Sequence, residues 1–405
     1  MASRAVVVIG GGITGTLTAR ALAGAGWQVT LLEAAHLGAG SSSRTAAGIR
    51  QQFSTPASVR GMRHAVRFYR EWGESLGESP IRQSGYLFLS GHDADPDAGP
   101  ARVRLQQENG LAEVSWLSAA ETVARFPWVD VDQISGASWC PTDGFLYPSL
   151  VYMEAAREAR ERGATIVQGA PVERADHVGG RLVRVHTPKG TFEADLFIDA
   201  TNAWSPRLAN VLGALALDIA PIKRFLWFLP RGGPMDAETL AAMPLVVGPR
   251  GGYCRPENAG SLLMGFAHQT ASEPAFTYED QDLVPPEFSH RGGLDALPFE
   301  VWLQLAEVIP ALGEFDGIHA TTAGFYAVTP DHNPFLGFDP QVPNLIRLAG
   351  FSGHGAMFGP VSAAVAVALA DAGRDLPAID TPEGRVELAS FAIGRAYAHA
   401  ESLVI

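Results

Sequence analysis

The stretch from Val6 to Ala34, VVVIGGGITGTLTARALAGAGWQVTLLEA, decides the fold. It begins with a β-branched apolar run that is typical of a buried parallel strand. A glycine-rich turn follows, then helical spacing of apolar residues from Ile13 to Ala25, and Gly26 ends that helix. Residues 28–32 return to a strand pattern. The stretch therefore predicts the strand–turn–helix–strand unit that opens a Rossmann-like α/β domain.

The glycines of the turn, Gly10, Gly12 and Gly15, fit the G-x-G-x-x-G pattern of a dinucleotide site. The first glycine permits a tight turn, the second lets the backbone approach a pyrophosphate, and the third lets the helix pack closely on the strand. Glu33 ends the next strand, where a carboxylate accepts hydrogen bonds from a ribose. An ordinary strand–helix turn is the alternative, but the position between a strand and a helix favours the nucleotide site.

The composition excludes several classes of protein. The chain has 405 residues and a formal charge of −13, and it contains no basic run, so a nucleic-acid partner is not expected. Its two cysteines, Cys140 and Cys254, form no CxxC pair, so a metal site built on thiolates is not expected. The first apolar run and the alanine-rich stretch 361–373 are both shorter than a membrane span. We expect a soluble, cytoplasmic protein without a membrane partner.

The alternation of helix and strand patterns is interrupted twice. Short strands, a turn region with prolines and one helix are expected between 79 and 147, and residues 219–317 are again rich in strand and loop patterns. This predicts a nucleotide-binding domain in three pieces, 1–78, 148–218 and 318–405. The two interruptions would form a second, α+β domain built on an antiparallel sheet. In such an arrangement the active site is expected at the seam between the domains.

Further segments carry a resemblance to a known family. They are LGAGSSSRTAAGIR (37–50), DLFIDATNAWSPRLA (195–209), GGYCRPENAGSLLMGF (251–266), AGFYAVTPDHNPFLG (323–337) and LAGFSGHGAMFGP (348–360). In this order, and after the glycine turn, they resemble the D-amino-acid oxidase/sarcosine oxidase superfamily of FAD-dependent oxidoreductases. The most similar branch contains glycine oxidase, the sarcosine oxidase β-subunit and the dimethylglycine-oxidising enzymes. The resemblance implies that the nucleotide is FAD.

The resemblance also implies which residues contact FAD. Relatives that tether the flavin use a cysteine at the place of Gly324, or a histidine just after the serine loop, where Ser43 and Arg44 stand. Neither tether exists here, so non-covalent FAD is expected. A glycine is usual where Asn202 stands. The expected cofactor-binding residues are Gly10, Gly12, Ile13, Thr14, Gly15, Glu33, Ala34, Ser41, Ser42, Ser43, Arg44, Val172, Thr201, Trp204, Gly353, His354, Gly355, Ala356 and Met357.

Four residues are candidates for substrate binding and catalysis. The resemblance places Arg50 where an arginine pairs with the substrate carboxylate, and the guanidinium fork suits that task because it can bind both oxygens. Tyr253 and Arg255 stand on a strand that faces the flavin in relatives, and His354 is expected beside the ring as a possible proton acceptor. An ordinary surface arginine and a capping or core histidine are the alternatives for Arg50 and His354.

The resemblance implies oxidation of a C–N bond next to a carboxylate. Hydride transfer from a sarcosine-, dimethylglycine-, glycine- or proline-like substrate to the flavin would give an imine that hydrolyses. A 2-hydroxy-acid dehydrogenase is the alternative reaction, since Arg50 would serve it equally. A FAD-binding assembly factor without catalysis is the alternative outside enzymes.

The acceptor of the electrons is predicted from two positions. Sarcosine oxidases carry a lysine in the segment that corresponds to SLLMGF, and its charge favours the reaction with oxygen. Leu263 and Met264 stand there in this chain, and Met357 replaces the lysine of the family's GHGFK-type motif. A dehydrogenase or a slow oxidase is therefore expected, unless Lys223 or Arg224 supplies the missing charge.

Overall fold

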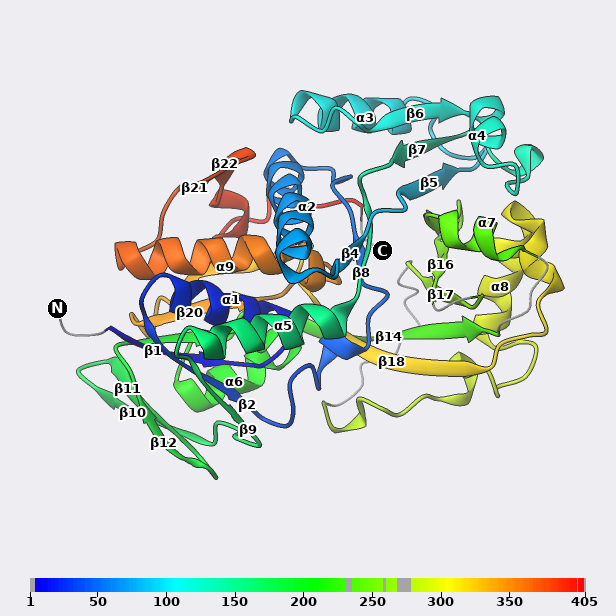
Figure 1. Cartoon of the computed structure of the whole chain (residues 1–405). Helices are drawn as coiled ribbons and strands as arrows, with labels where there is room; N and C mark the ends of the chain where they lie inside the picture. The colour runs from blue at the N-terminus through cyan, green and yellow to red at the C-terminus, as the bar shows by residue number, and fades with distance from the viewer. Residues whose placement is uncertain (1–3, 231–234, 258–259, 268–277, 399, 404–405) are drawn as a thin grey trace.

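The computed structural model describes residues 4–230, 235–257, 260–267, 278–398 and 400–403. The chain folds into two halves that lie side by side, each built on its own β-sheet (Figure 1). The predicted α/β class with a second, mostly antiparallel sheet is confirmed. Helices cover the first sheet on both faces and lie against one face of the second.

The first sheet is the nucleotide-binding one, and its strands come from three separate parts of the chain. Its order is β19–β20–β13–β1–β2–β9, parallel throughout except for the antiparallel edge strand β19. The alternation of strand and crossover helix produces such a parallel sheet, because a crossover must pass over one face. Its strands are β1 (Ala5–Ile9), β2 (Gln28–Glu33), β9 (Thr165–Gln168), β13 (Leu196–Asp199), β19 (Phe335–Phe338) and β20 (Leu345–Ala349).

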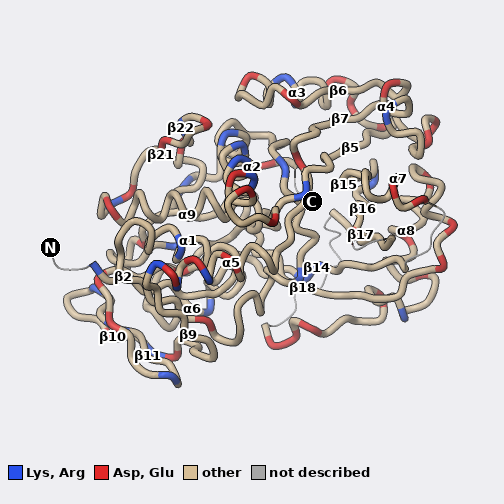
Figure 2. The backbone as a smooth tube through the Cα atoms, viewed as in Figure 1, with Lys and Arg blue, Asp and Glu red and all other residues tan. Residues whose placement is uncertain are grey.

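Four helices pack together over one face of this sheet. They are α1 (Ile13–Gly24), α2 (Pro56–Leu76), α5 (Pro148–Glu161) and α9 (Gly355–Ala372). α1 packs between α5 and α9, and α2 packs on α9. Both signs of charge lie along α2 and α5 (Figure 2), as expected for helices with one solvent face. The other face is covered by α6 (Ser205–Leu212) and by the small sheet β10 (Arg174–Val178), β11 (Arg181–Thr187) and β12 (Gly190–Glu193).

The helix α9 is longer than its alanine-rich sequence indicates. It begins at Gly355 and runs for 18 residues, with a mean hydropathy of 1.5, so by length and composition alone it could cross a membrane. The sequence expectation that this stretch is too short for a span is therefore wrong. In this structure 61% of the helix is buried. Its apolar residues belong to the core of the nucleotide-binding half.

The second sheet has the order β18–β14–β17–β16–β15–β5–β7–β6. Only β15 and β5 are parallel to each other; the remaining pairs are antiparallel. Its strands are β5 (Tyr86–Ser90), β6 (Ser115–Ser118), β7 (Gly136–Cys140), β14 (Ala220–Leu229), β15 (Leu245–Val247), β16 (Gly252–Pro256), β17 (Leu262–Phe266) and β18 (Ala320–Val328). The helices of this half are α3 (Ala98–Glu108), α4 (Ala119–Arg125), α7 (Ala237–Ala242) and α8 (Leu297–Val308).

Two features of the second half differ from the sequence expectation. Residues 98–108 form a helix, although the prolines of this region indicated a turn. Pro100 lies in the first turn of α3, where a missing backbone N–H costs nothing. The strand β18 pairs with β14 from Ala320 to Val328, so the first strand after the predicted boundary at 318 belongs to the second sheet.

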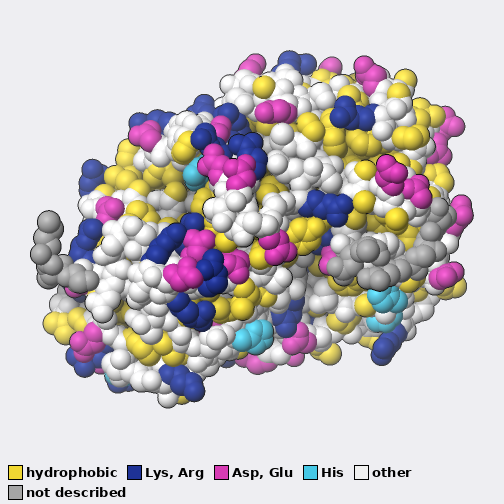
Figure 3. Space-filling view, in the orientation of Figure 1, with side chains coloured by type: hydrophobic (Ala, Val, Ile, Leu, Met, Phe, Trp, Pro, Cys, Tyr) yellow, Lys and Arg dark blue, Asp and Glu magenta, His cyan; other side chains and the backbone are white. Residues whose placement is uncertain are grey.

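A small sheet at the seam connects the halves. It consists of β3 (Gly48–Ile49), β8 (Gly144–Leu146) and β4 (Ile81–Arg82), with β8 in the middle. β3 directly precedes Arg50, so the position of that residue is fixed by backbone pairing to the inserted segment. On the face seen in Figure 3, acidic and basic side chains of the described residues are interspersed rather than gathered by sign.

Candidate cofactor and substrate site

A cavity of about 630 Å³ lies at the seam, where the carboxyl ends of β1, β2 and β13 meet β18. Parallel sheets bind their ligands at this edge. Fifteen of the predicted cofactor-binding residues line the cavity: Gly10, Gly12, Ile13, Thr14, Glu33, Ala34, Ser41, Ser42, Arg44, Val172, Thr201, Trp204, Gly353, Gly355 and Ala356.

The glycine turn forms one wall of the cavity and could not form with larger residues. Gly10 has a φ of +110°, and a Cβ there would lie 2.7 Å from the carbonyl oxygen of Ala200. A Cβ on Gly15 would lie 1.9 Å from the carbonyl oxygen of Gly10. Gly15 therefore does not line the cavity; it lets α1 pack against the turn. This is the division of work that the G-x-G-x-x-G pattern predicts.

The first turn of α1 presents its backbone amides to the cavity. The Ile13 N–H donates to Oγ of Ser42 at 3.0 Å. Beside it, the carboxylate of Glu33 accepts from the N–H of Gly11 at 2.6 Å and from that of Ala35 at 2.8 Å. The helix N-terminus favours an anionic ligand, and the carboxylate at the end of β2 favours hydroxyl donors. Both chemistries suit a dinucleotide.

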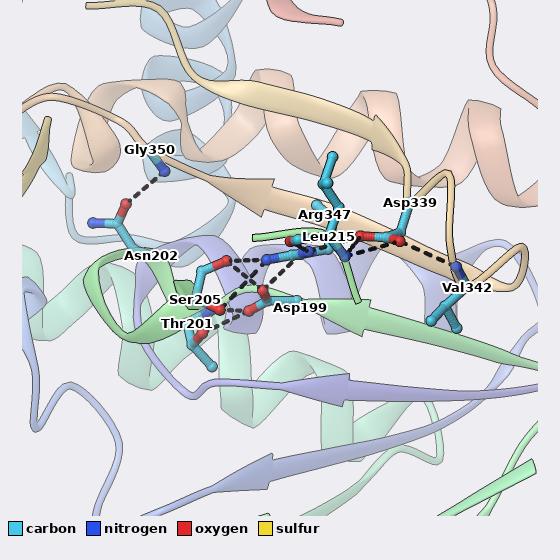
Figure 4. Close-up of polar contacts among 9 residues, drawn as sticks. All are labelled: Asp199, Thr201, Asn202, Ser205, Leu215, Asp339, Val342, Arg347 and Gly350. Atoms are coloured by element: carbon cyan, nitrogen blue, oxygen red, sulfur yellow. Dashed lines mark hydrogen bonds and ion pairs between the residues drawn. The ribbon is translucent and has the colours of Figure 1, made fainter. Parts of the chain in front are cut away.

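A buried ionic network holds the opposite wall (Figure 4). Arg347 on β20 is fully buried; its Nε donates to Asp199 at 2.9 Å and its Nη1 to Asp339 at 2.8 Å. Asp199 ends β13, and it also accepts from the hydroxyls of Thr201 and Ser205, both at 2.6 Å. The network fixes the segment after β13, of which Thr201 lines the cavity.

Asn202 ties the two walls of this region together. Its φ is +52°, and its Oδ1 accepts from the N–H groups of Gly350 and Phe351 at 3.1 and 3.2 Å (Figure 4). Asparagine tolerates this left-handed conformation better than most residues. The Asn202 side chain therefore satisfies the N–H groups of Gly350 and Phe351, which a glycine at this position could not do.

Three predicted cofactor residues besides Gly15 do not line the cavity. The hydroxyl of Ser43 lies 3.5 Å from the carbonyl oxygen of Gly40, on the outer side of the serine loop. Met357 is buried in the core with the rest of α9. His354 stands between the lining residues Gly353 and Gly355, but its ring is directed away from the cavity toward Arg50.

Arg44 lines the cavity and braces the serine loop. Its guanidinium pairs with Asp282 at 2.7 Å and donates to the carbonyls of Ala39 and Gly40. The residue thereby connects the loop after β2 with a segment of the second half. Its sequence-based interpretation as a residue that contacts cofactor or backbone agrees with these contacts.

Arg50 and His354 form a buried pair behind the cavity lining, next to the lining residues Gly353 and Gly355. Nη2 of Arg50 is 3.3 Å from Nε2 of His354, and the guanidinium stacks 4.1 Å from the ring centroid of Phe53. Arg50 is fully buried, and burial lowers its pKa from the usual value. Burial, followed by the charge of Arg50, holds the pKa of His354 well below its usual value. His354 is therefore neutral at pH 7, and the surface alternative for Arg50 is wrong.

Tyrosines surround this pair. Tyr326 lines the cavity, and the buried Tyr253 lies beside it. Tyr86 lies next to Arg50; burial raises the pKa of its phenol, and the charge of Arg50 opposes that rise. Gly353 leaves room for the ring of Tyr326, because a Cβ at this position would lie 2.3 Å from that ring. Tyr86 was not among the predicted residues, and a tyrosine in an apolar strand carries no sequence signal that could have found it.

Arg255 does not join this group. Its Nε donates to the carbonyl of Ala46 and its Nη1 to that of Pro256, both at 2.7 Å, and Nη1 also pairs with Glu257 at 2.5 Å. Its guanidinium lies 4.4 Å from the ring centroid of Phe145. Every one of these partners is outside the residues that line the cavity. The contacts give Arg255 a structural task at the seam, and its place at the substrate stays a prediction.

The two cations named as possible substitutes for the missing lysine differ in position. Nζ of Lys223 donates to the carbonyls of Asp280 and Leu283. The guanidinium of Arg224 lies 5.3 Å from the ring centroid of Tyr326, which lines the cavity. Leu263 belongs to an apolar cluster with Tyr86 and Tyr253. Nζ of Lys223 in turn lies 5.9 Å from the ring centroid of Phe325, which also lines the cavity, so both cations are close to the cavity wall.

Known proteins match the chain over most of its length. FAD-dependent oxidoreductase domain-containing protein 1 of Bos taurus is 28% identical over 400 residues, which cover 88% of this chain and 78% of that protein. Glycine oxidase of Bacillus subtilis (strain 168) is 27% identical over 370 residues, 89% of this chain and 90% of the relative. The crystal structure of L-proline dehydrogenase from P. horikoshii superimposes with a TM-score of 0.81 at 30% identity, covering 92% and 94% of the two chains.

The residues around the cavity fit FAD. The glycine cradle, the amides at the start of α1 and the carboxylate of Glu33 would hold the dinucleotide, and the segment from Gly353 to Ala356 would lie against the flavin. The family of FAD dependent oxidoreductases, DAO, matches residues 5–369. The protein is thus a FAD-dependent oxidoreductase, and its chain belongs to the DAO family.

Proposed function

We propose that this enzyme oxidises the C–N bond of an amino acid or of an N-substituted amino acid. One observation carries the proposal: the fully buried guanidinium of Arg50 lies behind the cavity lining and contacts His354, whose chain neighbours Gly353 and Gly355 line the cavity. The charges of Glu401 and Asp143 act on Arg50, but no carboxylate is hydrogen-bonded to it, and a substrate carboxylate would supply that bond. The names of glycine oxidase and L-proline dehydrogenase agree with such a substrate.

Arg50 would bind and orient the substrate. Its hydrogen-bond partners are the carbonyls of Gln52 and Leu403 and Nε2 of His354, all of them neutral. An uncharged His354 accepts from the guanidinium when its ring proton is on Nδ1. We therefore assign His354 to orienting Arg50 rather than to taking the substrate proton. When bound, FAD would supply the two-electron acceptor.

The reduced enzyme is proposed to pass its electrons to an acceptor other than oxygen, or to react with oxygen only slowly. Leu263 lies in an apolar cluster, so this segment places no charge at the site. Lys223 is turned to backbone carbonyls of Asp280 and Leu283. Both cations lie on the outer side of a lining aromatic ring, Lys223 at 5.9 Å from the centroid of Phe325 and Arg224 at 5.3 Å from that of Tyr326. A dehydrogenase, or an oxidase that reacts slowly, follows from this arrangement.

An anaerobic titration tests the function. The FAD-loaded protein is mixed, without oxygen, with sarcosine, dimethylglycine, glycine, proline, other D- and L-amino acids and 2-hydroxy acids, one at a time, and the flavin absorbance is recorded. Bleaching by an amine supports the proposal, and admitting air afterwards separates an oxidase from a dehydrogenase by the speed at which the absorbance returns.

The same titration separates the alternatives. Bleaching by 2-hydroxy acids alone would replace the proposal with 2-hydroxy-acid oxidation. A protein whose flavin none of these compounds reduces, although dithionite does, would be assigned to FAD binding without catalysis on small acids.

A further inference from the structure

The last residues that the structure describes, Glu401 to Leu403, lie against Arg50 behind the cavity lining. The carbonyl of Leu403 accepts a hydrogen bond from Nη2 of Arg50. Arg50 and Leu403 are separated by 353 residues in the sequence, so the contact is made only in the folded chain. We propose that this C-terminal segment is a wall of the substrate site, and that a substrate carboxylate must displace the Leu403 carbonyl to reach Arg50. The inference rests on the carboxylate-binding role proposed for Arg50.

Glu401 anchors the segment. Its side chain is only 1% exposed, and Oε1 accepts from the N–H of Ser54 at 2.9 Å and from the Ser54 hydroxyl at 2.7 Å. Its backbone N–H donates to the carbonyl of Asp331 at 2.9 Å. The N–H of Leu403 returns to the same carboxylate at 3.0 Å. A buried carboxylate with several donors is a specific attachment, because removing its partners would leave it unpaired.

Ser54 and Thr55 precede the helix α2, and their side chains serve this attachment. The hydroxyl of Thr55, at the N-cap position, donates to Ser58 at 2.9 Å and lies 3.5 Å from Glu401, while it makes no capping bond to the helix backbone. The N–H of Ser402 donates to the hydroxyl of Ser54 at 2.9 Å. The start of α2 therefore holds the C-terminal segment.

The side chain of Leu403 fills space beside the proposed substrate position. It packs on the apolar cluster that contains Tyr86, Phe88, Tyr253 and Leu263. Tyr86 and Phe88 both lie against Arg50. The carbonyl of Leu403 thus occupies a hydrogen-bond donor of Arg50, and its side chain covers the apolar surface next to that donor. Both are features that an amino-acid substrate would use.

The chemistry of Arg50 favours exchange of the carbonyl for a carboxylate. Nε of Arg50 has no hydrogen-bond partner among the described residues, and Nη1 and Nη2 contact neutral groups. A hydrogen bond between two charged groups is roughly twice as strong as a neutral one. A carboxylate also accepts two bonds of the fork at once, which a single carbonyl cannot do.

A thiol label tests the displacement. Cys140 and Cys254 are free and buried, so a thiol introduced by Leu403→Cys would be the reactive one. The FAD-loaded variant is treated with a maleimide in the presence of acetate, a carboxylate without an amine to oxidise, or of acetamide, its neutral counterpart. We expect acetate to speed labelling several-fold in a saturable manner, and acetamide to leave the rate unchanged. Equal rates with and without acetate would overturn the proposal.

A second pair of variants tests the anchor. Glu401→Gln removes the charge that holds the segment, whereas Glu387→Gln makes the same change at an exposed glutamate on β22 (Gly384–Glu387). Acetate binding is followed by the change in the flavin spectrum. We expect Glu401→Gln to bind acetate several-fold more tightly than the parent and Glu387→Gln to bind it equally. Unchanged or weaker binding in Glu401→Gln would overturn the proposal.

The two proposals can fail separately. If amines bleach the flavin but acetate leaves labelling unchanged, the C-terminal segment is not displaced and the proposed reaction still stands. If acetate speeds labelling but no amine bleaches the flavin, the wall is real and the proposed reaction is wrong.

Discussion

The guanidinium of Arg50 and the ring of His354 are hydrogen-bond neighbours, with 3.3 Å between Nη2 and Nε2, and both side chains are buried. Such a pair is stable only with the histidine uncharged, because a second cation at this distance would repel the first. The pair therefore keeps one fixed positive charge and one neutral ring behind the lining of the cofactor cavity.

Replacing Arg50 by alanine should weaken substrate binding while FAD stays bound. Truncating one partner of a buried charge pair typically costs about 3 kcal/mol, which is roughly a hundredfold rise in KM for a carboxylate substrate. KM and the ratio of bound flavin to protein are measured together. Arg385→Ala, at an exposed ion pair with Glu387, is the control. A KM that does not change in Arg50→Ala would remove Arg50 from its proposed role.

His354 should make the fold sensitive to acid. Its pKa is lower in the folded chain than in the unfolded one, so the unfolded state binds the proton first. The stability that the neutral ring contributes is complete above the unfolded pKa of about 6.5 and is lost as the pH falls below it. We expect the melting temperature of His354→Gln to fall less than that of the parent between about pH 7 and pH 5. Parallel curves would contradict this.

Asp143 should act in the opposite direction. It is fully buried and accepts from Gln51 and Gln52, and burial raises the pKa of its carboxyl to about 6. Because the pKa of this carboxyl is higher in the folded chain than in the unfolded one, the folded state binds the proton more tightly. The resulting stabilisation is complete below the unfolded pKa and is lost as the pH rises through about 6. The loss is on the order of 3 kcal/mol, from about two pKa units.

The variant Asp143→Asn should remove this dependence. Urea unfolding of the parent and of the variant is compared at about pH 4.5 and pH 7, a range that spans the expected titration. We expect the parent to lose stability relative to Asp143→Asn on going to the higher pH. A difference between the two proteins that is the same at both pH values would show that Asp143 does not titrate in this range.

Gly15→Ala should prevent FAD binding without a change in the cavity lining. Its Cβ would lie 1.9 Å from the carbonyl oxygen of Gly10, so α1 and the turn must separate. Gly61→Ala in α2 is the matched control, since its Cβ would find its nearest atom at 3.5 Å, an ordinary contact. We expect Gly15→Ala to be purified with little flavin and Gly61→Ala with the parental amount, measured by absorbance. A fully loaded Gly15→Ala would refute the packing argument.

Arg347→Leu should destabilise the fold and loosen the FAD site together. The substitution leaves the carboxylates of Asp199 and Asp339 buried without their cation, a loss of about 3–5 kcal/mol. Arg157→Leu on α5 removes an arginine from exposed ion pairs, which contribute about 0–1 kcal/mol. Melting temperature and FAD dissociation constant are measured for both. Equal melting temperatures would mean that the network of Figure 4 contributes little.

The sequence was sufficient for the parts of the site that follow from local pattern. Gly10, Gly12 and Glu33 sit where the spacing of one strand–turn–helix–strand unit puts them. The pattern could not fix which strands the later segments join. β18 follows the predicted domain boundary at 318, yet it pairs with β14 of the second sheet. The pairing partner of a strand depends on the strands available in the fold and not on its neighbours in sequence.

The partners of long-range polar contacts could not be predicted from the sequence. Arg347 stands in the apolar run LIRLA, where a lone charge signals a buried partner but does not say which one. Tyr253 and Arg255 are two residues apart on one strand, yet Tyr253 reaches the cavity wall and Arg255 finds carbonyls and Glu257. The contact of Leu403 with Arg50 depends on the whole fold, so no local pattern announces it.

The position of Leu403 bears on how this protein should be prepared. A purification tag attached after Ile405 would follow Leu403, whose carbonyl accepts from Arg50, by only two residues. The other end of the chain is remote, since Arg4 pairs with Asp371, roughly 24 Å along α9 from the cavity-lining Gly355. An N-terminal tag is therefore the choice that leaves ligand affinities undisturbed, and kinetic constants from C-terminally tagged material would describe an altered enzyme.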